Sequence, residues 1–176
     1  MRRSAAAVAS AVFFLAEPCV VGGLIPWLVT RWHVPGAMSP FAVLRMATGG
    51  VFLVLAVAVL IRAFARFVVE GRGTPAPIAP PDRLVVGGDY RFVRNPMYLA
   101  LITAILGQAM IFDSLRLLLY AVIVWAITAT FVHWYEEPVL LNRYGDDYRR
   151  YRQAVRAWLP RLRRWQPDLE HSSDAS

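Results

Sequence analysis

Two polar clusters interrupt an otherwise apolar sequence, and their residue types can bind a charged ligand. The first cluster comprises Tyr90, Arg94, Asn95, Pro96 and Tyr98, and the second comprises Glu136 and Glu137. An arginine can bind a carboxylate or a phosphate through paired hydrogen bonds. Two adjacent carboxylates at a membrane boundary are costly unless they meet a cation or water. Both clusters therefore contain candidate binding residues. Whether these residues can bind one ligand together depends on the helices and loops that position them.

The first cluster stands at the expected start of a helix. Pro96 suits the first turn of a helix, where its missing N–H is not needed, and Asn95 is a suitable N-cap. The preceding residues, 62–95, are rich in proline and glycine, which predicts fixed turns instead of a long helix. The rest of the cluster would then lie near the positive end of a helix dipole. Two simpler interpretations stay open: a plain linker, or tyrosine and arginine side chains that only anchor the interface.

The composition places most of the chain against a bilayer. The 176 residues are 57% hydrophobic with a mean hydropathy of +0.44, whereas a soluble domain is about 45 to 50% apolar. The length allows one domain, and the basic residues are 19 arginines without any lysine. A net charge of +7 can favour nucleic acid, but long uncharged apolar runs favour a membrane partner and no nucleic acid. The single cysteine excludes an intramolecular disulfide.

Four apolar runs are long enough, or nearly so, to cross a bilayer as helices, which takes about 20 residues each. They are residues 5–29, 41–61, 97–112 and 115–133. The third run has 16 residues, so we expect a tight helical hairpin with the fourth. The predicted fold is an all-α integral membrane protein with about four transmembrane helices, a Pro/Gly-rich cytoplasmic loop and a C-terminal amphipathic helix. Residues 1–166 would form its single domain, and residues 167–176 have the composition of a disordered tail.

The arginines indicate the orientation of these spans, because positively charged loops stay in the cytoplasm. Sixteen of the 19 lie in the N-terminus, the middle loop or the C-terminal segment, and only Arg31, Arg45 and Arg116 lie at the opposite ends. Both termini are therefore expected on the cytoplasmic side of an inner membrane of the bacterial type. A cleaved signal peptide is the rival interpretation of the basic N-terminus, but the apolar run extends past the usual length of about 15 residues.

An antiparallel hairpin of the last two spans would bring the polar clusters together. Met97 begins one helix at the level where His133 ends the other, so Arg94 can approach the two glutamates. The glutamates could instead be solvated at the start of a helix at Pro138, where the dipole favours negative charge. An interfacial amphipathic helix is predicted by residues that recur at helical spacing: Tyr148, Tyr151, Val155 and Trp158. Such a helix either closes over a pocket or binds anionic lipid.

Five motifs occur in the order and spacing of a known family. They are Gly71-x-Gly73-Thr74-Pro75-Ala76-Pro77, Leu84-Val85-Val86-x-Gly88-x-Tyr90-Arg91-x-Val93-Arg94-Asn95-Pro96-Met97-Tyr98, Leu106-Gly107, Glu136-Glu137-x-x-Leu140 and Tyr144-Gly145-x-x-Tyr148-x-x-Tyr151. Over about residues 65–160 the chain resembles the isoprenylcysteine carboxyl methyltransferases and the related phospholipid methyltransferases. The first two apolar runs match this family only as hydrophobic segments.

The resemblance implies an integral-membrane methyltransferase that uses S-adenosylmethionine, bound on the cytoplasmic side. Carried over by position, the cofactor-binding residues would be Tyr90, Arg94, Asn95, Pro96, Tyr98, Glu136 and Glu137, with Arg94 and Glu137 as catalytic residues and no metal. The methyl acceptor would be lipophilic, such as an isoprenylcysteine-like carboxylate, a lipid or a thiol, and would enter from the bilayer. The chain departs from the family at Asn95, where histidine is common, and at Ala154-Val155-Arg156, where Arg-Val-Pro is common. If the family arginine holds the acceptor, the second departure argues against an isoprenylcysteine substrate.

Three other functions fit parts of the sequence. Glu17 lies inside the first span, and an intramembrane acid suits a small four-helix transporter coupled to protons, although a single carboxyl can also stay neutral there. The tyrosine-rich C-terminal pattern is shared with membrane reductases that use NADPH. A non-catalytic membrane scaffold is the simplest alternative. The transporter leaves the long Pro/Gly loop and the C-terminal extension without a role, so methyl transfer is the preferred function.

Overall fold

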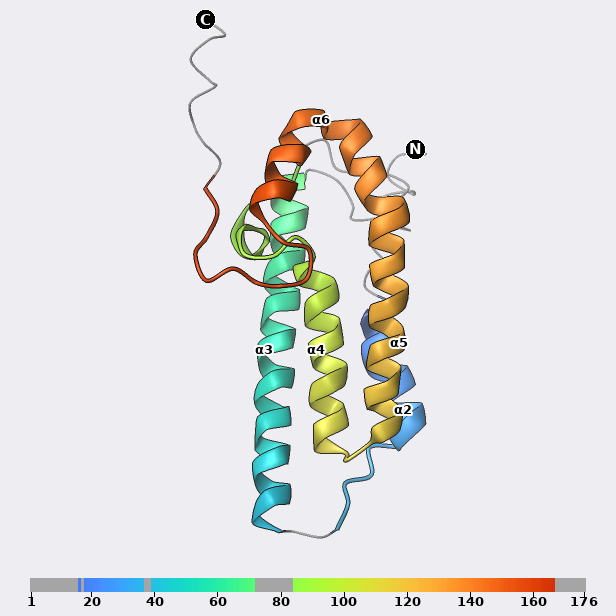
Figure 1. Ribbon diagram of the computed structural model, residues 1–176. Helices are drawn as coiled ribbons and strands as arrows, with labels where there is room; N and C mark the ends of the chain where they lie inside the picture. Colours follow the sequence, from blue (N-terminus) through green and yellow to red (C-terminus); the bar gives the residue numbers. More distant parts are fainter. Residues whose placement is uncertain (1–15, 17, 37–38, 72–83, 167–176) are drawn as a thin grey trace, which may run out of the picture.

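The protein is helical throughout the part of the chain that its computed structural model describes, which is residues 16, 18–36, 39–71 and 84–166. These residues contain no strand (Figure 1). The elements in chain order are the π-helix η1 (Val20–Leu24), α2 (Ile25–Thr30), α3 (Pro40–Gly71), the 3-10 helix η2 (Gly88–Arg91), α4 (Pro96–Ile111), α5 (Leu115–Phe131), the π-helix η3 (Val132–Glu136) and α6 (Glu137–Ala154). The predicted all-α fold class is thereby confirmed.

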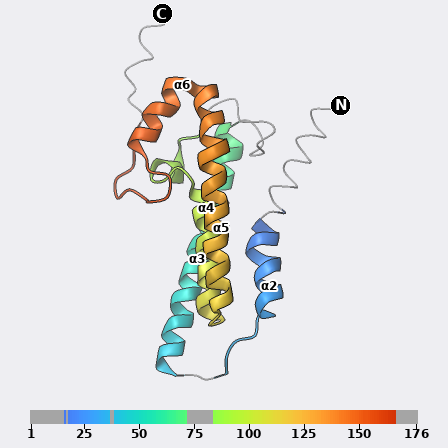
Figure 2. The same ribbon diagram turned by 45° about the vertical axis from the view of Figure 1, so that its right-hand side comes forward.

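Helices α3, α4 and α5 run side by side and form the body of the molecule, with α4 in the middle (Figure 1). Helix α2 lies on the opposite side of the α4 and α5 pair from α3 (Figure 2). At one end of the bundle α6 turns back and leads into residues 155–165, which we call the C-terminal strap (Figure 1). The polar clusters belong to this end, since α4 begins there and α5 ends there.

The outer surfaces of α3 and α5 are apolar. The segment Pro40–Arg66 and the continuous helix that begins at Leu115 are each long and apolar enough to cross a membrane, and Val20–Thr30 and Pro96–Ile111 are shorter apolar helices. Leu44, Val54 and Ile127 expose 65, 69 and 64% of their surface. Contiguous exposed apolar surface of this kind is typical of contact with a membrane. The limits of the four individual spans stay predictions. The prediction that turns begin at residue 62 was wrong, because α3 continues as a helix to Gly71. Glu17, on which the transporter hypothesis depends, lies outside the described residues.

Helices α3 and α4 cross at two glycines whose backbones nearly touch. A Cβ atom on Gly49 would lie 2.6 Å from the carbonyl oxygen of Gly107, and one on Gly107 would lie 2.7 Å from the carbonyl oxygen of Gly49. Small residues let helices in a bilayer approach closely, and van der Waals contacts then stabilise the pair without help from the hydrophobic effect. Gly107 of the Leu106-Gly107 motif therefore has a packing role.

The N-terminal helical segment is held by side chains that bind its free carbonyl groups. Pro26 has no N–H to donate to the carbonyl of Gly22, which stands four residues earlier. Gln108 of α4, itself buried, donates its Nε2 to this carbonyl oxygen at 2.8 Å. The hydroxyl of Tyr120 in α5 donates to the carbonyl of Val21 at 3.0 Å. Gln108 and Tyr120 thus provide hydrogen bonds to backbone carbonyls that the proline and the π-helical turn leave without a partner.

The helix after α5 does not begin anew at Pro138, as one interpretation of the sequence expected. A π-helical turn, η3, joins α5 to α6 without a break, and the N–H of Glu137 donates to the carbonyl of Val132, five residues back. This wider turn accommodates the proline, which stands in the first turn of α6. The direction of the chain changes later, at Gly145, whose φ of 52° and ψ of −122° are not helical. Because that φ is positive, the turn favours glycine.

The predicted amphipathic helix after Gly145 is shorter than expected. It ends at Ala154, and Val155 has extended backbone angles, so the predicted places of Val155 and Trp158 on this helix were wrong. Trp158 instead lies in the C-terminal strap, where its ring meets that of Trp125 edge to face, with centroids 6.4 Å apart. This contact connects the strap to α5, and aromatic pairs of this geometry are stabilising, whereas Trp and Val have only a modest helical preference.

Gly49→Ala should lower the stability of the protein, while Gly50→Ala should not. The added methyl group at position 49 meets backbone of α4, and overpacking of this kind costs about 1–3 kcal/mol. A methyl group at position 50 meets nothing within 4 Å and restricts the unfolded chain, so its effect should be neutral or slightly stabilising. Thermal unfolding of the two variants in the same detergent measures the difference. Equal midpoints would mean that the glycine crossing is not tight.

Candidate functional site

The C-terminal strap is attached by backbone hydrogen bonds to the segment that precedes α4. The carbonyl of Arg156 accepts from the N–H of Arg94 at 2.9 Å. The carbonyls of Phe92 and Arg91 accept from the N–H groups of Arg161 and Trp165, at 2.9 and 3.1 Å. Figure 1 shows the strap passing beside this segment. The strap and the segment before α4 are therefore held together at one end of the bundle.

A buried ion pair joins the two polar clusters. Nη1 of Arg94 lies 2.8 Å from Oε1 of Glu137, and their side chains are only 11 and 8% exposed. The same Nη1 donates to the hydroxyl of Tyr148 at 3.0 Å. Nη2 of Arg152 lies 3.3 Å from the second oxygen of Glu137. Glu137 therefore stands between two guanidinium groups, which supplies the charge pairing that a buried carboxylate needs.

Glu136, the neighbouring carboxylate, has a different environment. Burial raises the pKa of Glu136 from 4.5 to about 7; the hydrogen bond from Tyr98 and the charge of Arg94 act in the opposite direction, and the charge of Glu137 adds to the rise. Its Oε2 is shielded from solvent and has no hydrogen-bond partner among the residues described. Two adjacent carboxylates thus have different roles: one is bound in ion pairs, and the other is still able to accept a partner.

Tyrosines line the inner side of this site. Tyr90, Tyr148 and Tyr151 are 7, 2 and 3% exposed. The hydroxyl of Tyr151 donates to the carbonyl of Tyr90 at 2.7 Å, so α6 is fixed to η2. Burial raises the pKa of Tyr148 to about 12 and raises that of Tyr151 further above its ordinary value. Both hydroxyls are therefore neutral at physiological pH and serve as hydrogen-bonding groups.

Asn95 and Pro96 begin α4 as the sequence predicts, but the side chain of Asn95 does not cap the helix. Pro96 stands in the first turn, and Asn95 occupies the N-cap position without a capping hydrogen bond from its side chain. Its Nδ2 donates instead to the carbonyl of Ala157 in the strap, at 3.2 Å. The side chain is thus used for a long-range contact, which an N-cap preference cannot predict.

Arg94 meets the two glutamates, as the hairpin hypothesis predicts, and Tyr98 joins them through its hydrogen bond to Glu136. Tyr90 contacts α6 instead, through the hydrogen bond that its carbonyl accepts from Tyr151. Tyr148 and Arg152 are contacts that the sequence interpretation did not assign to the site. Their spacing of four residues places both on one face of α6, which is the signal that could have found them. This spacing alone does not predict that Tyr148 and Arg152 belong to the site, because the turn at Gly145 decides which way that face of α6 points.

Comparison with known families agrees with this geometry. A family model described as phospholipid methyltransferase matches residues 44–147, which is more than half of the chain and includes both polar clusters. The chain belongs to the phospholipid methyltransferase family. A comparison with curated proteins gives no significant match. The resemblance seen in the motifs is confirmed, and this protein is a membrane methyltransferase that acts on lipid-like substrates. The C-terminal strap lies beyond the matched residues.

Glu136→Gln should remove a pH-dependent loss of stability. Since the pKa of Glu136 is raised from 4.5 to about 7 in the folded protein, the folded state holds this proton more tightly than the unfolded state. The free energy of unfolding therefore falls as the pH rises from 4.5 to about 7, by about 3 kcal/mol at most. The glutamine variant should exceed the parent methyltransferase in stability at pH 8 and match it more closely at pH 5, as measured by thermal unfolding.

Asp146→Asn provides the matched control for this titration. Its carboxylate lies on α6 with its side chain 81% exposed, so its removal should leave the pH dependence of stability unchanged. If the difference between Glu136→Gln and the parent protein were the same at pH 5 and pH 8, the carboxyl of Glu136 would not be held protonated by burial.

Proposed function

We propose that the protein transfers a methyl group from S-adenosylmethionine to a lipophilic acceptor at the cytoplasmic face of the membrane. The observation that carries the proposal is the pair of buried polar atoms beside the Arg94 and Glu137 ion pair that have no partner. Within the described part of the chain three buried side-chain atoms lack a hydrogen-bond partner, namely Oε2 of Glu136, Nε of Arg94 and Nε of Arg91, and the first two belong to this site. A buried polar group without a partner costs about 1–3 kcal/mol, and more if charged, so a ligand that pairs with these atoms is favoured.

The charges of the cofactor fit these residues. S-adenosylmethionine has an ammonium and a sulfonium group, with which a carboxylate pairs, and a carboxylate, with which an arginine pairs. In the proposal Glu136 balances the cationic groups and Arg94 binds the carboxylate. Tyr90, Asn95, Pro96 and Tyr98 form the surrounding wall. S-adenosylmethionine supplies an electrophilic methyl group, and the remaining work of the site is to bind, orient and exclude water.

Glu137 acts through Arg94 in this proposal. Its two oxygens already engage Arg94 and Arg152, and breaking a buried pair of this kind costs about 3–5 kcal/mol. Tyr148 supports the same guanidinium from a second direction. Glu137 is therefore a positioning residue, and Glu136 is the carboxylate that we assign to the ligand.

The chemistry of the acceptor decides whether a base is needed. A carboxylate or thiolate acceptor attacks without losing a proton, so positioning and electrostatics suffice. An amine acceptor must lose a proton, and a base with a pKa near the working pH is suited to this. Glu136 pairs with the cationic groups of the cofactor in this proposal, so it is not assigned as that base. The exposed apolar faces of α3 and α5 support an acceptor that arrives from the bilayer.

The arginine distribution supports a cytoplasmic position for the site. Arg62, Arg66, Arg94 and the arginines of α6 belong to the end of the bundle that holds the site, whereas Arg31 and Arg45 stand at the other end. Because cytoplasmic segments retain positive charge, we place the site and both termini in the cytoplasm, with the helices in an inner membrane.

The test is binding of labelled S-adenosylmethionine to the purified protein in detergent. Arg94→Ala and Glu136→Gln should each weaken binding about tenfold or more, because each removes a hydrogen bond to a charged group. Glu137→Gln should also weaken cofactor binding, because Arg94 loses the ion pair that holds its guanidinium in place. Binding to the parent protein should also strengthen as the pH rises through 7, where Glu136 becomes charged.

Arg149→Ala is the control for this test. Its side chain is 65% exposed on α6 and pairs with Asp146, away from the buried pair, so cofactor binding should not change. The site assignment fails if Arg94→Ala and Glu136→Gln bind the cofactor like the parent protein. Binding of NADPH in place of S-adenosylmethionine would support the reductase instead.

A further inference from the structure

The C-terminal strap is bonded at two points to the segment before α4 and forms a short loop between them. The carbonyl of Arg156 accepts from the N–H of Arg94, and the N–H of Arg161 donates to the carbonyl of Phe92. Residues 157–160, which we call the strap tip, lie between these two points and have the sequence Ala-Trp-Leu-Pro. An apolar tip with an arginine on each side suits a segment that meets the surface of a membrane.

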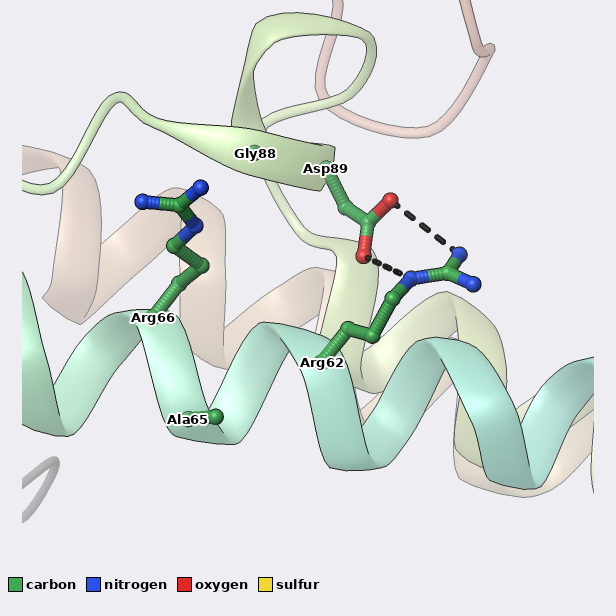
Figure 3. Close-up of a pocket in the computed structure, with 5 residues that line it drawn as sticks. All are labelled: Arg62, Ala65, Arg66, Gly88 and Asp89. Carbon is green, nitrogen blue, oxygen red and sulfur yellow. Dashed lines mark hydrogen bonds and ion pairs between the residues drawn. The ribbon is translucent and has the colours of Figure 1, made fainter.

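The segment to which the strap is bonded is itself held against α3. Nε and Nη2 of Arg62 in α3 each lie 3.3 Å from a different oxygen of Asp89 in η2, as Figure 3 shows. η2 ends at Arg91, whose carbonyl accepts from the N–H of Trp165 in the strap at 3.1 Å. A continuous set of contacts therefore connects the strap to a membrane helix and defines where its tip lies.

Trp158 places the strap tip beside the apolar part of the bundle. Its ring packs against the buried cluster of α4 and α5 that includes Leu101 and Val124. Leu101 lies five residues after Pro96, which is about 7 Å along the axis of α4. The ring also meets that of Trp125, which is 47% exposed. Because Trp125 belongs to the exposed apolar face of α5, the strap tip continues this face.

The backbone of the strap tip is suited to surroundings with little water. Irregular backbone at the depth of a membrane is tolerated only where protein satisfies its polar groups. Nδ2 of Asn95 donates to the carbonyl of Ala157 at 3.2 Å, and Nη1 of Arg161 donates to the carbonyl of Ala154 at 2.6 Å. Pro160 has no N–H that needs a partner. These features lower the cost of moving the tip out of water.

The outer side of the strap tip is apolar, and charges follow directly. Leu159 exposes 62% of its surface, Pro160 is exposed, and Leu162 just beyond the tip is fully exposed. Arg163 and Arg164 come next and are exposed as well. Such a sequence fits the boundary between hydrocarbon and lipid head groups, where apolar side chains insert and arginine keeps its charged end in the polar layer.

We propose that the strap tip and the neighbouring Leu162 insert into the adjacent leaflet of the bilayer, while Arg156 and Arg163 stay among the head groups. A bilayer is favoured over a protein partner because the tip continues the apolar face of α5, and because the arginines on both sides match the anionic surface of a membrane. The chain would then meet the membrane through a loop as well as through its helices. This proposal does not depend on the cofactor, so it can fail while the proposed function holds.

The test measures the depth of a nitroxide spin label on a single cysteine of the full chain, in nanodiscs of dioleoylphosphatidylcholine and dioleoylphosphatidylglycerol. Cys19→Ser removes the natural cysteine. In that background Leu159→Cys places the label on the strap tip, Ile127→Cys on the apolar face of α5, and Asp146→Cys on α6, where the side chain is 81% exposed. Electron paramagnetic resonance then compares collisions of the label with oxygen, which concentrates in lipid, and with a soluble nickel chelate.

The ratio of oxygen to nickel collisions for Leu159→Cys should exceed that for Asp146→Cys several-fold and approach that for Ile127→Cys. Leu162→Cys replaces a fully exposed side chain, so it provides a second position with little risk to folding, and its ratio should also exceed that for Asp146→Cys. The proposal is overturned if either strap label has the ratio of Asp146→Cys, as a strap in water would give. A strap label shielded from both reagents would mean that protein covers the tip, which also overturns the bilayer as its partner.

Discussion

The ion pair between Arg94 and Glu137 is the contact on which the arrangement of this methyltransferase depends. It connects the start of α4 to the junction of α5 and α6, at the end of the bundle where the strap also attaches. Tyr148 and Arg152 of α6 complete the pairing that two charges shielded from water need. The position of α6 over the bundle and the organisation of the site are therefore coupled.

The two glutamates illustrate how neighbours in sequence acquire different chemistry. Successive residues of a helix point in directions about 100° apart, so Glu137 meets the guanidinium groups while Glu136 meets Tyr98 and a less polar environment. Glu137 is held in two ion pairs, and burial raises the pKa of Glu136. The same backbone turn thus provides a structural anion and a group that can bind a cation or carry a proton.

The sequence was sufficient to predict the helical membrane fold and the meeting of Arg94 with the glutamates. Apolar length is a local signal, and the hairpin after residue 112 places the ends of α4 and α5 at one level. The path of the chain beyond Glu137 was not predictable in the same way. It depends on a π-helical turn, on the positive φ of Gly145 and on backbone N–H and carbonyl groups of the strap. Nearly every residue type has these backbone groups, so the sequence does not reveal which of them form the contacts.

The attachment of the strap through its backbone has a consequence for how the family can diversify. Hydrogen bonds between main-chain groups do not depend on side chains, so residues such as Arg156 and Leu159 are free to change without detaching the strap. The strap lies beyond the residues that match the family. Substitutions there would alter the exposed surface at this end of the bundle, while the buried charges and the backbone contacts of the strap stay the same.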